Sequence, residues 1–380
     1  MRLPVGSAEE ERADGFAVSG LVDCSCAVTG YRESPLDDPG DSARAIAELL
    51  LRHGVAAVRD LGSGLDASGR FAAHAKGRVA VVGGGPVLVD AAPRAEGDRP
   101  VRDADQVRRA LDGLVAEEVG WVTVRATQPE FLADVSRAAR ERGLRVAARG
   151  GTALAGACSG QVDLVEGLVA LAGSEAGRRP VEALTRLADS DPGPLSDRLL
   201  RAGAAGAAVV TELVALRRAA FVKESLSAPY LDDLIPILPH VRYMMQMRRS
   251  GGYLAGKRAL ARYSGLAEPS GSVLRQAERG WAVLLEAAAR AAAAGVPLLP
   301  GSKAPQLAVV PGYGLREEIA VLVFAGVDAR TALSAATDGA ARWLGLDPAV
   351  LAGVRLVRPG PPVTPEDVLD LTVAGATGPA

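Results

Sequence analysis

The segment Gly20-Leu-Val-Asp-Cys-Ser-Cys26 joins a short apolar run to a group of polar residues. Val18–Val22 has the length and composition of a buried β-strand, and Asp23 to Cys26 follow at its carboxyl end. In barrels built from parallel strands and helices, the carboxyl ends of the strands carry the functional side chains. The segment therefore predicts the first strand of an α/β fold and a first group of candidate site residues.

Similar apolar runs recur along the chain and are separated by amphipathic segments. The runs predicted as strands two to eight are Val55–Asp60, Val79–Val82, Trp121–Val124, Leu144–Ala148, Val162–Glu166, Ala207–Thr211 and Val296–Leu299. Helices are predicted at Asp41–Arg52, Ala104–Glu117, Glu130–Arg142, Leu315–Phe324, Ala329–Ala336 and Asp338–Leu344. Short strands that alternate with such helices are typical of βα units around a parallel sheet. Eight units predict an α/β fold of the (β/α)8, TIM-like barrel type.

Composition excludes several classes of protein. The chain has 380 residues, 48% of them hydrophobic, and a formal net charge of −2, so it is globular and has no charge that would attract nucleic acid. Aromatic residues make up 4%, which leaves little for base stacking. No apolar run reaches the roughly 18 residues of a membrane span, and the amino terminus lacks an apolar signal segment. Three cysteines, an odd number, favour a reducing compartment. We expect a cytoplasmic protein without nucleic-acid or membrane partners.

Four segments resemble the amidohydrolase superfamily, in its imidazolonepropionase/prolidase-like branch. They are Gly20–Asp23, Val58–Ser63, Gly301–Pro305 and Val310-Pro-Gly-Tyr313. The resemblance spans about residues 18–345 and implies a (β/α)8 barrel with catalytic metal ions at the carboxyl ends of its strands. It also implies an accessory β-sandwich built from segments on both sides of the barrel.

The division of the chain follows from this resemblance. Residues 1–17 show no strand-length apolar alternation, so we expect an amino-terminal extension and a truncated sandwich. Residues 18–345 form the barrel, and residues 346–380 a remnant of the sandwich, with a strand near Val354–Val357 and an apolar piece at Val368–Val373 of undetermined structure. Residues 225–270, rich in Tyr, Met and Arg, are expected to form helices over the barrel mouth. Their Met and Tyr residues fit either a packed core or a lid that contacts a ligand.

The metal ligands that the resemblance implies are replaced at every strand end. The positions are Cys24 and Cys26 on the first strand, Thr123 on the fourth, Arg149 and Gly151 on the fifth, Gly167 after the sixth and Lys303 on the eighth. Arg149 and Lys303 would repel a cation. The remaining histidines, His53, His74 and His240, do not rebuild the set, and His53 is expected to be a cation at the end of the first helix. We predict no metal and no cofactor.

The replaced site defines the candidate residues. Arg149 can bind a carboxylate or enolate through two hydrogen bonds, and Lys303 can act as a general base or a Schiff-base nucleophile. The candidate catalytic residues are Lys303, Arg149, Asp23, Thr123 and Glu212. The candidate substrate-binding residues are Cys24, Cys26, Asp60, Glu166, Ser302 and Tyr313. Cationic neighbours would make the two thiols more acidic.

Two functions remain open from the sequence. The first is a metal-independent enzyme that acts on a small organic substrate by a cyclisation, isomerisation, lyase or hydrolytic step. The second is a catalytically inactive amidohydrolase homologue that binds a small molecule or a partner, in which Lys303 pairs with Asp23 or Asp60 and neutralises the cavity. A metal-dependent C–N hydrolase is a distant third. A homo-oligomer is compatible with any of them.

Overall fold

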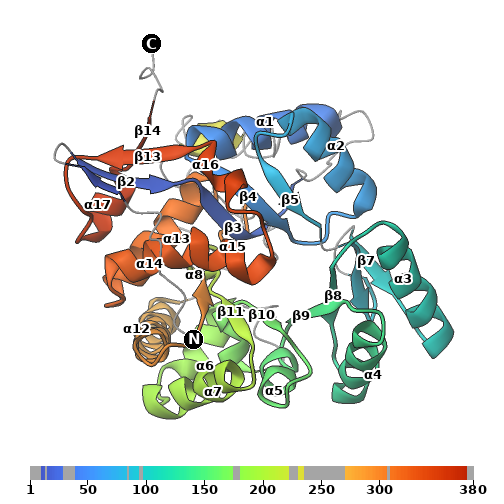
Figure 1. The fold of residues 1–380 in the computed structure, drawn as a ribbon. Coiled ribbons are helices and arrows are strands. Elements are labelled where there is room, and N and C mark those ends of the chain that lie inside the picture. Colours follow the sequence, from blue (N-terminus) through green and yellow to red (C-terminus); the bar gives the residue numbers. More distant parts are fainter. Residues whose placement is uncertain are drawn as a thin grey trace, which may run out of the picture.

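A computed structural model describes residues 10–12, 15–28, 39–83, 85–93, 97–173, 180–221, 230–234, 270–305 and 309–374. Parallel strands lie at its centre and helices lie outside them (Figure 1). One sheet has the order β3-β4-β5 and the other the order β12-β11-β10-β9-β8-β6-β7. The strands are β3 Leu21–Cys26, β4 Val55–Asp60, β5 Ala80–Val82, β6 Val87–Val89, β7 Asp98–Pro100, β8 Trp121–Arg125, β9 Arg145–Arg149, β10 Leu164–Glu166, β11 Ala208–Val210 and β12 Leu298–Leu299.

The two sheets meet along β3. Cys26 forms a parallel bridge with Ala304, the N–H of Cys24 donates to the carbonyl of Pro300, and the N–H of Lys303 donates to the carbonyl of Ser25. On the other side, β5 pairs with β4 whereas β6 pairs with β8. β5 and β6 are consecutive in the chain but pair with different strands, so they belong to different sheets. The predicted third strand, Val79–Val82, corresponds to β5, and β6 and β7 were not predicted.

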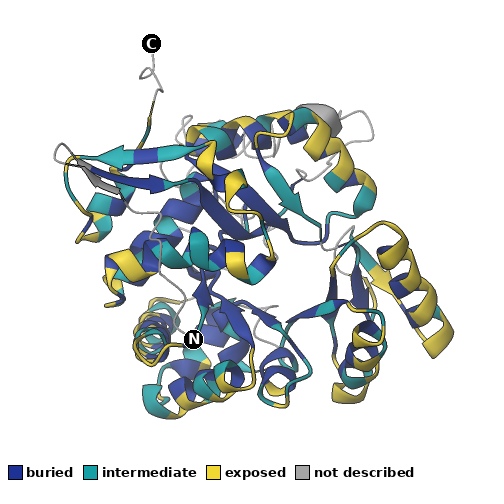
Figure 2. Ribbon diagram, in the orientation of Figure 1, coloured by how far each residue is buried: buried dark blue, intermediate teal, exposed yellow. Residues whose placement is uncertain are grey.

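The strand predictions are otherwise confirmed in place, with shorter limits at β10, β11 and β12. β3 and β4 are buried along their whole length (Figure 2). The helices of the barrel are α1 Pro39–Arg52, α2 Leu65–Ala75, α3 Ala104–Ala116, α4 Pro129–Arg140, α5 Ala153–Cys158, α6 Pro180–Leu187, α7 Pro192–Ala204, α8 Leu213–Ala220, α12 Gly271–Ala293, α13 Tyr313–Phe324, α14 Ala329–Ala335 and α15 Asp338–Leu344. Shorter helical pieces are η1 Leu168–Ala172, η2 Leu231–Leu234, α16 Ala349–Ala352 and α17 Pro365–Leu369.

A four-stranded antiparallel sheet joins the two ends of the described chain. Its order is β1-β2-β13-β14, with β1 Glu10–Arg12, β2 Gly15–Ser19, β13 Arg355–Arg358 and β14 Thr372–Val373. Val18 lies opposite Leu356. The strand predicted near Val354–Val357 is confirmed, and Val368–Val373 resolves into the end of α17 and β14. The prediction that residues 1–17 lack strands is wrong, because β1 and β2 obtain their partners from each other and from the distant β13.

The predicted first strand, Val18–Val22, is also wrong in its limits. The chain leaves the four-stranded sheet at Gly20 and enters the barrel as β3, which continues to Cys26. A Cβ atom on Gly20 would lie 2.5 Å from the Cβ of Ala56 and 3.0 Å from that of Val354. Only a glycine fits where the chain passes from one sheet to the other. Because β3 begins after Gly20 and runs to Cys26, Asp23 to Cys26 lie within the strand and not beyond its end.

Most of the predicted insertion at 225–270 lies outside the described residues, which here include only Tyr230–Leu234 and Ser270. Its expected place over the barrel mouth stays a prediction, as does the position of His240. No helix in the described parts is long and apolar enough to cross a membrane.

Candidate functional site

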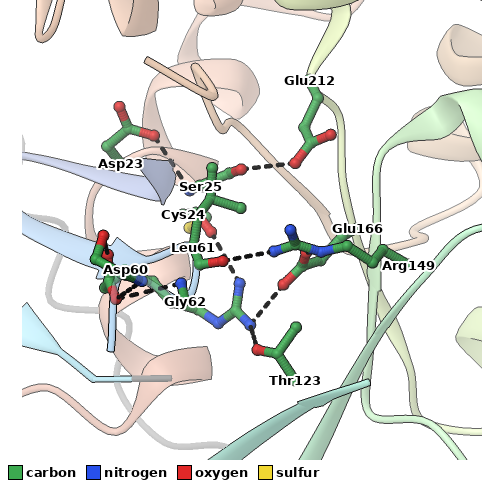
Figure 3. A network of polar contacts seen from close by, with 12 residues as sticks. Asp23, Cys24, Ser25, Asp60, Leu61, Gly62, Thr123, Arg149, Glu166 and Glu212 are labelled. Atoms are coloured by element: carbon green, nitrogen blue, oxygen red, sulfur yellow. Dashed lines mark hydrogen bonds and ion pairs between the residues drawn. The ribbon is translucent and has the colours of Figure 1, made fainter. Parts of the chain in front are cut away.

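Glu166 at the end of β10 lies between two arginines at the carboxyl ends of the strands (Figure 3). Arg59 of β4 donates from Nη2 to Glu166 Oε1 at 2.7 Å, and Arg149 of β9 donates from Nε to Oε2. Arg59 and Glu166 are fully buried, while Arg149 keeps 20% of its side chain exposed. Burial alone would raise the pKa of Glu166, but the charges of Arg149 and Arg59 outweigh it and lower the pKa to about 2. Glu166 is therefore a fixed anion.

Glu212 lies two residues beyond the end of β11, whose last residue, Val210, is the one that pairs with Glu166. Its Oε1 accepts the hydroxyl of Ser25 at 2.6 Å, and its Oε2 accepts the ammonium of Lys303 at 2.6 Å. The Glu212 side chain is 3% exposed, and that of Lys303 is 29% exposed. This cluster thus has one hydroxyl, one buried carboxylate and one ammonium that reaches the surface. Lys303 pairs with Glu212, so the expected pairing with Asp23 or Asp60 is wrong.

The backbone of this second cluster is unusual. Glu212 has φ 51° and Lys303 has φ 57°, two of five non-glycine residues with positive φ in the described chain. Such a conformation costs roughly 1–3 kcal/mol for a residue with a Cβ and persists only where the surroundings impose it. Gly167, after β10, makes room for Glu212, because a Cβ there would lie 2.8 Å from Glu212 Oε2. Two strained residues joined by an ion pair are typical of a functional site.

Asp23 of β3 lies behind the second cluster. The N–H groups of Ser25 and Ser302 donate to its Oδ1 at 3.2 and 2.9 Å, and the Ser302 hydroxyl donates to Oδ2 at 2.5 Å. Complete burial raises the pKa of Asp23 to about 7, although these hydrogen bonds oppose the shift. Asp23 and Ser302 therefore fix the backbone on which Ser25 and Lys303 are carried, and neither side chain is accessible.

Asp60, at the end of β4, has a local structural role. It accepts hydrogen bonds from the N–H groups of Val28, Gly62 and Ser63 and from the hydroxyls of Ser63 and Ser68. Complete burial raises its pKa against these bonds. Asp60 thus closes the loop after β4 (Figure 3).

The two cysteines are not activated thiols. Both side chains of Cys24 and Cys26 are fully buried. Burial raises the pKa of each thiol, with Asp23 adding to the shift, and the nearby Arg59 does not reverse it at Cys24. The expectation that cationic neighbours would make them acidic is wrong, because desolvation outweighs the single favourable charge.

Three further residues named from the sequence have other surroundings. Thr123 of β8 is buried and accepts a hydrogen bond from Arg59 Nη2 at 3.2 Å. Tyr313 begins α13 and packs its ring against His53 and Tyr230, with centroids 5.5 and 4.8 Å away. Burial, with the charges of Arg316 and Arg52, lowers the pKa of His53 to about 4, so it is neutral and not the expected helix-end cation.

The donor set at the strand ends does not fit a divalent metal. The thiols of Cys24 and Cys26 are fully buried, and the carboxylates of Glu166 and Glu212 are already bound to side-chain cations. Within the described residues, no three His, Cys, Asp or Glu side chains converge where they could hold an ion.

Sequence reasoning missed two members of the site, Arg59 and Ser25. Arg59 is a charged residue in the middle of the apolar run Val55–Asp60, and this is a signal because an unpaired charge is rarely fully buried. Ser25 faces the barrel because β3 continues past Asp23. The structure brings together Arg149, Glu166 and Thr123 in one cluster and Lys303, Glu212, Asp23 and Ser302 in the other.

A separate cavity of about 250 Å³ lies where α12 ends and β12 begins. Its lining includes Pro297, Leu298, Thr331, Ser334 and Trp343. Pro297 and Leu298 lie at the amino end of β12, whereas Thr331 and Ser334 belong to α14 and Trp343 to α15.

Known structures resemble this chain over nearly its whole length. A bottromycin amidohydrolase is 21% identical, with a TM-score of 0.59, and the match covers 91% of this chain and 72% of that one. A Xaa-Pro dipeptidase with bound methionine in its active site is 15% identical, with a TM-score of 0.59, covering 94% and 84%. An ochratoxinase from A. niger is 15% identical, with a TM-score of 0.57, covering 93% and 78%. No protein-family model and no curated protein sequence matches. The chain has the amidohydrolase fold, as the sequence predicted.

Proposed function

We propose that this amidohydrolase-fold protein is a metal-independent enzyme that moves protons on a small organic substrate carrying a carboxylate. The observation that carries the proposal is the ion pair between Glu212 and Lys303. Both residues have strained backbones, and they follow adjacent strands at the end of the barrel where active sites are built.

Each charged group has a role in this proposal. Arg149 uses Nε and Nη2 for Glu166 and the carbonyl of Leu61, and among the described residues its Nη1 has no hydrogen-bond partner. Nη1 and the partly exposed Lys303 are therefore the groups that meet the substrate carboxylate or a developing anion. The fixed charge of Glu166 keeps Arg149 in place.

The reaction that fits the pair is an isomerisation by proton transfer. Lys303, the exposed member, passes a proton to Glu212, and its amine then takes a proton from one atom of the substrate and gives it to another. The acid of Glu212 then returns its proton to the amine of Lys303 across the 2.6 Å contact that joins them. Substrate and enzyme are both balanced after one turnover, and no other reactant is needed.

The metal-independent part of the proposal has its own measurement. Purified protein analysed for transition metals should contain far less than one ion per chain. A stoichiometric metal that resists dialysis would overturn this part, because an ion bound to Glu166 or Glu212 would have to displace the side-chain cations paired with them.

The reaction is tested by hydrogen exchange in heavy water. The protein is incubated with a panel of small carboxylic acids and amides, and deuterium incorporation is followed by mass spectrometry. We expect incorporation into at least one compound, reduced on the order of 10²-fold or more in Lys303→Ala and in Glu212→Gln. The control is Lys76→Ala, because Lys76 also has positive φ, at 49°, but is exposed at the end of α2.

A second function is favoured by the closed ion pairs of Arg59, Glu166 and Arg149. In that case the chain is a catalytically inactive homologue that binds a small anion. Binding of a panel compound that depends on Arg149 and Lys303, without exchange in any compound, would identify this function. Neither binding nor exchange that depends on these residues would reject both.

A further inference from the structure

Glu318 is a fully buried acid on α13 whose contacts lie on both sides of Glu212. Its Oε1 accepts the hydroxyl of Thr211 and the N–H of Leu213, the latter at 2.7 Å. Its Oε2 accepts the N–H of Val214 at 2.7 Å. One carboxyl group therefore holds the residue before Glu212 and the two residues after it.

Such a clamp explains how Glu212 is kept in its strained conformation. A non-glycine residue with a left-handed backbone conformation returns to a more favourable φ unless its neighbours are held in place. The residue before it is held through a side chain and the residues after it are held through the backbone, so the turn between β11 and α8 cannot relax on either side.

We infer that Glu318 is a positioning residue that holds Glu212 in the conformation in which it pairs with Lys303. The inference rests on the proposed function for the role of the pair, although the geometry stands without it. Burial raises the pKa of Glu318 to about 8 in spite of its three hydrogen bonds, and the charge of Glu212 adds to the shift. The two acids are thus close enough to influence each other.

A simpler role for Glu318 is that of a helix cap. The N–H groups of Leu213 and Val214 are the first two of α8, and an acid near such groups stabilises a helix. A cap, however, does not require the bond to Thr211, which lies before Glu212. Removal of the Thr211 hydroxyl therefore separates the two roles.

The test measures the NMR signal of Lys303. The chain has four lysines, Lys76, Lys223, Lys257 and Lys303, so isotope-labelled lysine gives a simple NMR spectrum. The loss of one signal in Lys303→Arg assigns it. The change in that signal caused by Glu212→Gln defines loss of the ion pair. Circular dichroism and thermal unfolding confirm that each variant is folded.

We expect Glu318→Gln to move the Lys303 signal by more than half of the change seen in Glu212→Gln, because an amide cannot accept on both of its ends. Thr211→Val should move it in the same direction by less. The matched control is Glu317→Gln, one residue earlier on α13. Glu317 pairs with Arg218 at 2.5 Å, and its substitution should leave the Lys303 signal in place.

The outcomes decide the inference. A folded Glu318→Gln variant with an unchanged Lys303 signal overturns it, and so does an unchanged signal in Thr211→Val, which would leave Glu318 only the role of a helix cap. An equal shift in Glu317→Gln also overturns it. Because no substrate is involved, absence of turnover rejects the proposed function alone. If Glu212→Gln does not move the Lys303 signal, the ion pair itself is refuted.

Discussion

Glu166 and Glu212 are both buried carboxylates at the carboxyl ends of neighbouring barrel strands, yet their surroundings differ. Glu166 lies between two guanidinium groups, and one of them, Arg59, is fully buried. Glu212 lies between a hydroxyl and an ammonium that is 29% exposed, on a strained backbone. In the Glu166 cluster, burial and ion pairs fix the charged groups in place. The Glu212 cluster includes a cation, Lys303, that solvent and ligands can reach. We propose that Glu166 and Arg59 support the barrel, whereas the Glu212 cluster, together with Arg149, meets the substrate.

The largest expected effect is on the supporting cluster. Glu166→Gln should lower the free energy of unfolding by about 3–5 kcal/mol, because it leaves Arg59 buried without a counter-charge. Urea denaturation measures the change. The control is Glu286→Gln, which breaks an exposed pair with Arg290 on α12 and should cost well under about 1 kcal/mol. Equal losses in the two variants would remove the distinction on which the comparison rests.

A second prediction contrasts how Asp23 and Glu166 make the free energy of unfolding depend on pH. The pKa of Asp23, behind the Glu212 cluster, is raised from 3.8 to about 7, so its stabilising contribution is complete below pH 4 and is lost as the pH rises to about 7. The pKa of Glu166 is lowered from 4.5 to about 2, so its contribution is complete above pH 4.5 and is lost as the pH falls to about 2. The effects are on the order of 4 kcal/mol for Asp23 and 3 kcal/mol for Glu166.

The free energy of unfolding, measured between pH 3 and pH 8, tests these two opposite pH dependences. Asp23→Asn should flatten the decline between pH 4 and pH 7, and Glu166→Gln should flatten the decline below pH 4.5. A curve for Asp23→Asn that is parallel to the wild-type curve over the neutral range would show that Asp23 is ionised throughout.

A smaller stability effect is expected at the second carboxylate. Glu212→Gln should cost about 1–2 kcal/mol, because it weakens one charged hydrogen bond but leaves Lys303 in contact with water. Ligand binding or turnover should nevertheless be lost. A loss as large as that of Glu166→Gln would place Glu212 in the supporting role instead.

The smallest effect should combine two opposing contributions. Lys303→Asn should change the free energy of unfolding by less than about 1 kcal/mol, because asparagine tolerates positive φ better than lysine but leaves the buried Glu212 without its cation. The same variant should abolish ligand binding or turnover at the barrel mouth. Lys76→Asn, at a similar φ on the surface, gives the gain expected from the backbone alone. A clear destabilisation by Lys303→Asn would mean that the ion pair is structural.

The fold was largely predictable because its signal is local. Apolar runs between amphipathic segments mark barrel strands, and the predicted barrel is confirmed. Where the prediction failed, the cause was distant in sequence. Gly20 separates β2 from β3 because of contacts with Ala56 and Val354, although the run from Val18 to Val22 is nearly continuous. β2 itself depends on β13 for its pairing.

The site was predictable in its location but not in its pairings. Position at a strand end places Arg149 and Lys303 at the barrel mouth, but which carboxylate each one meets depends on side-chain geometry in three dimensions. Glu318 was missed because it is on a helix, where the strand-end rule gives no signal. The acidity of Cys24 was misjudged because the apolar atoms that desolvate its thiol come from strands far apart in the sequence.

The pairing of β2 with β13 also bears on how the protein is made. A ribosome synthesises β2 before any barrel strand, whereas β13 emerges only after β12 and the helices that follow it. At the usual 5–20 residues per second, β2 waits for tens of seconds with one edge open. An open strand edge invites pairing with other chains, so the nascent protein should depend on chaperones until its last strands leave the ribosome.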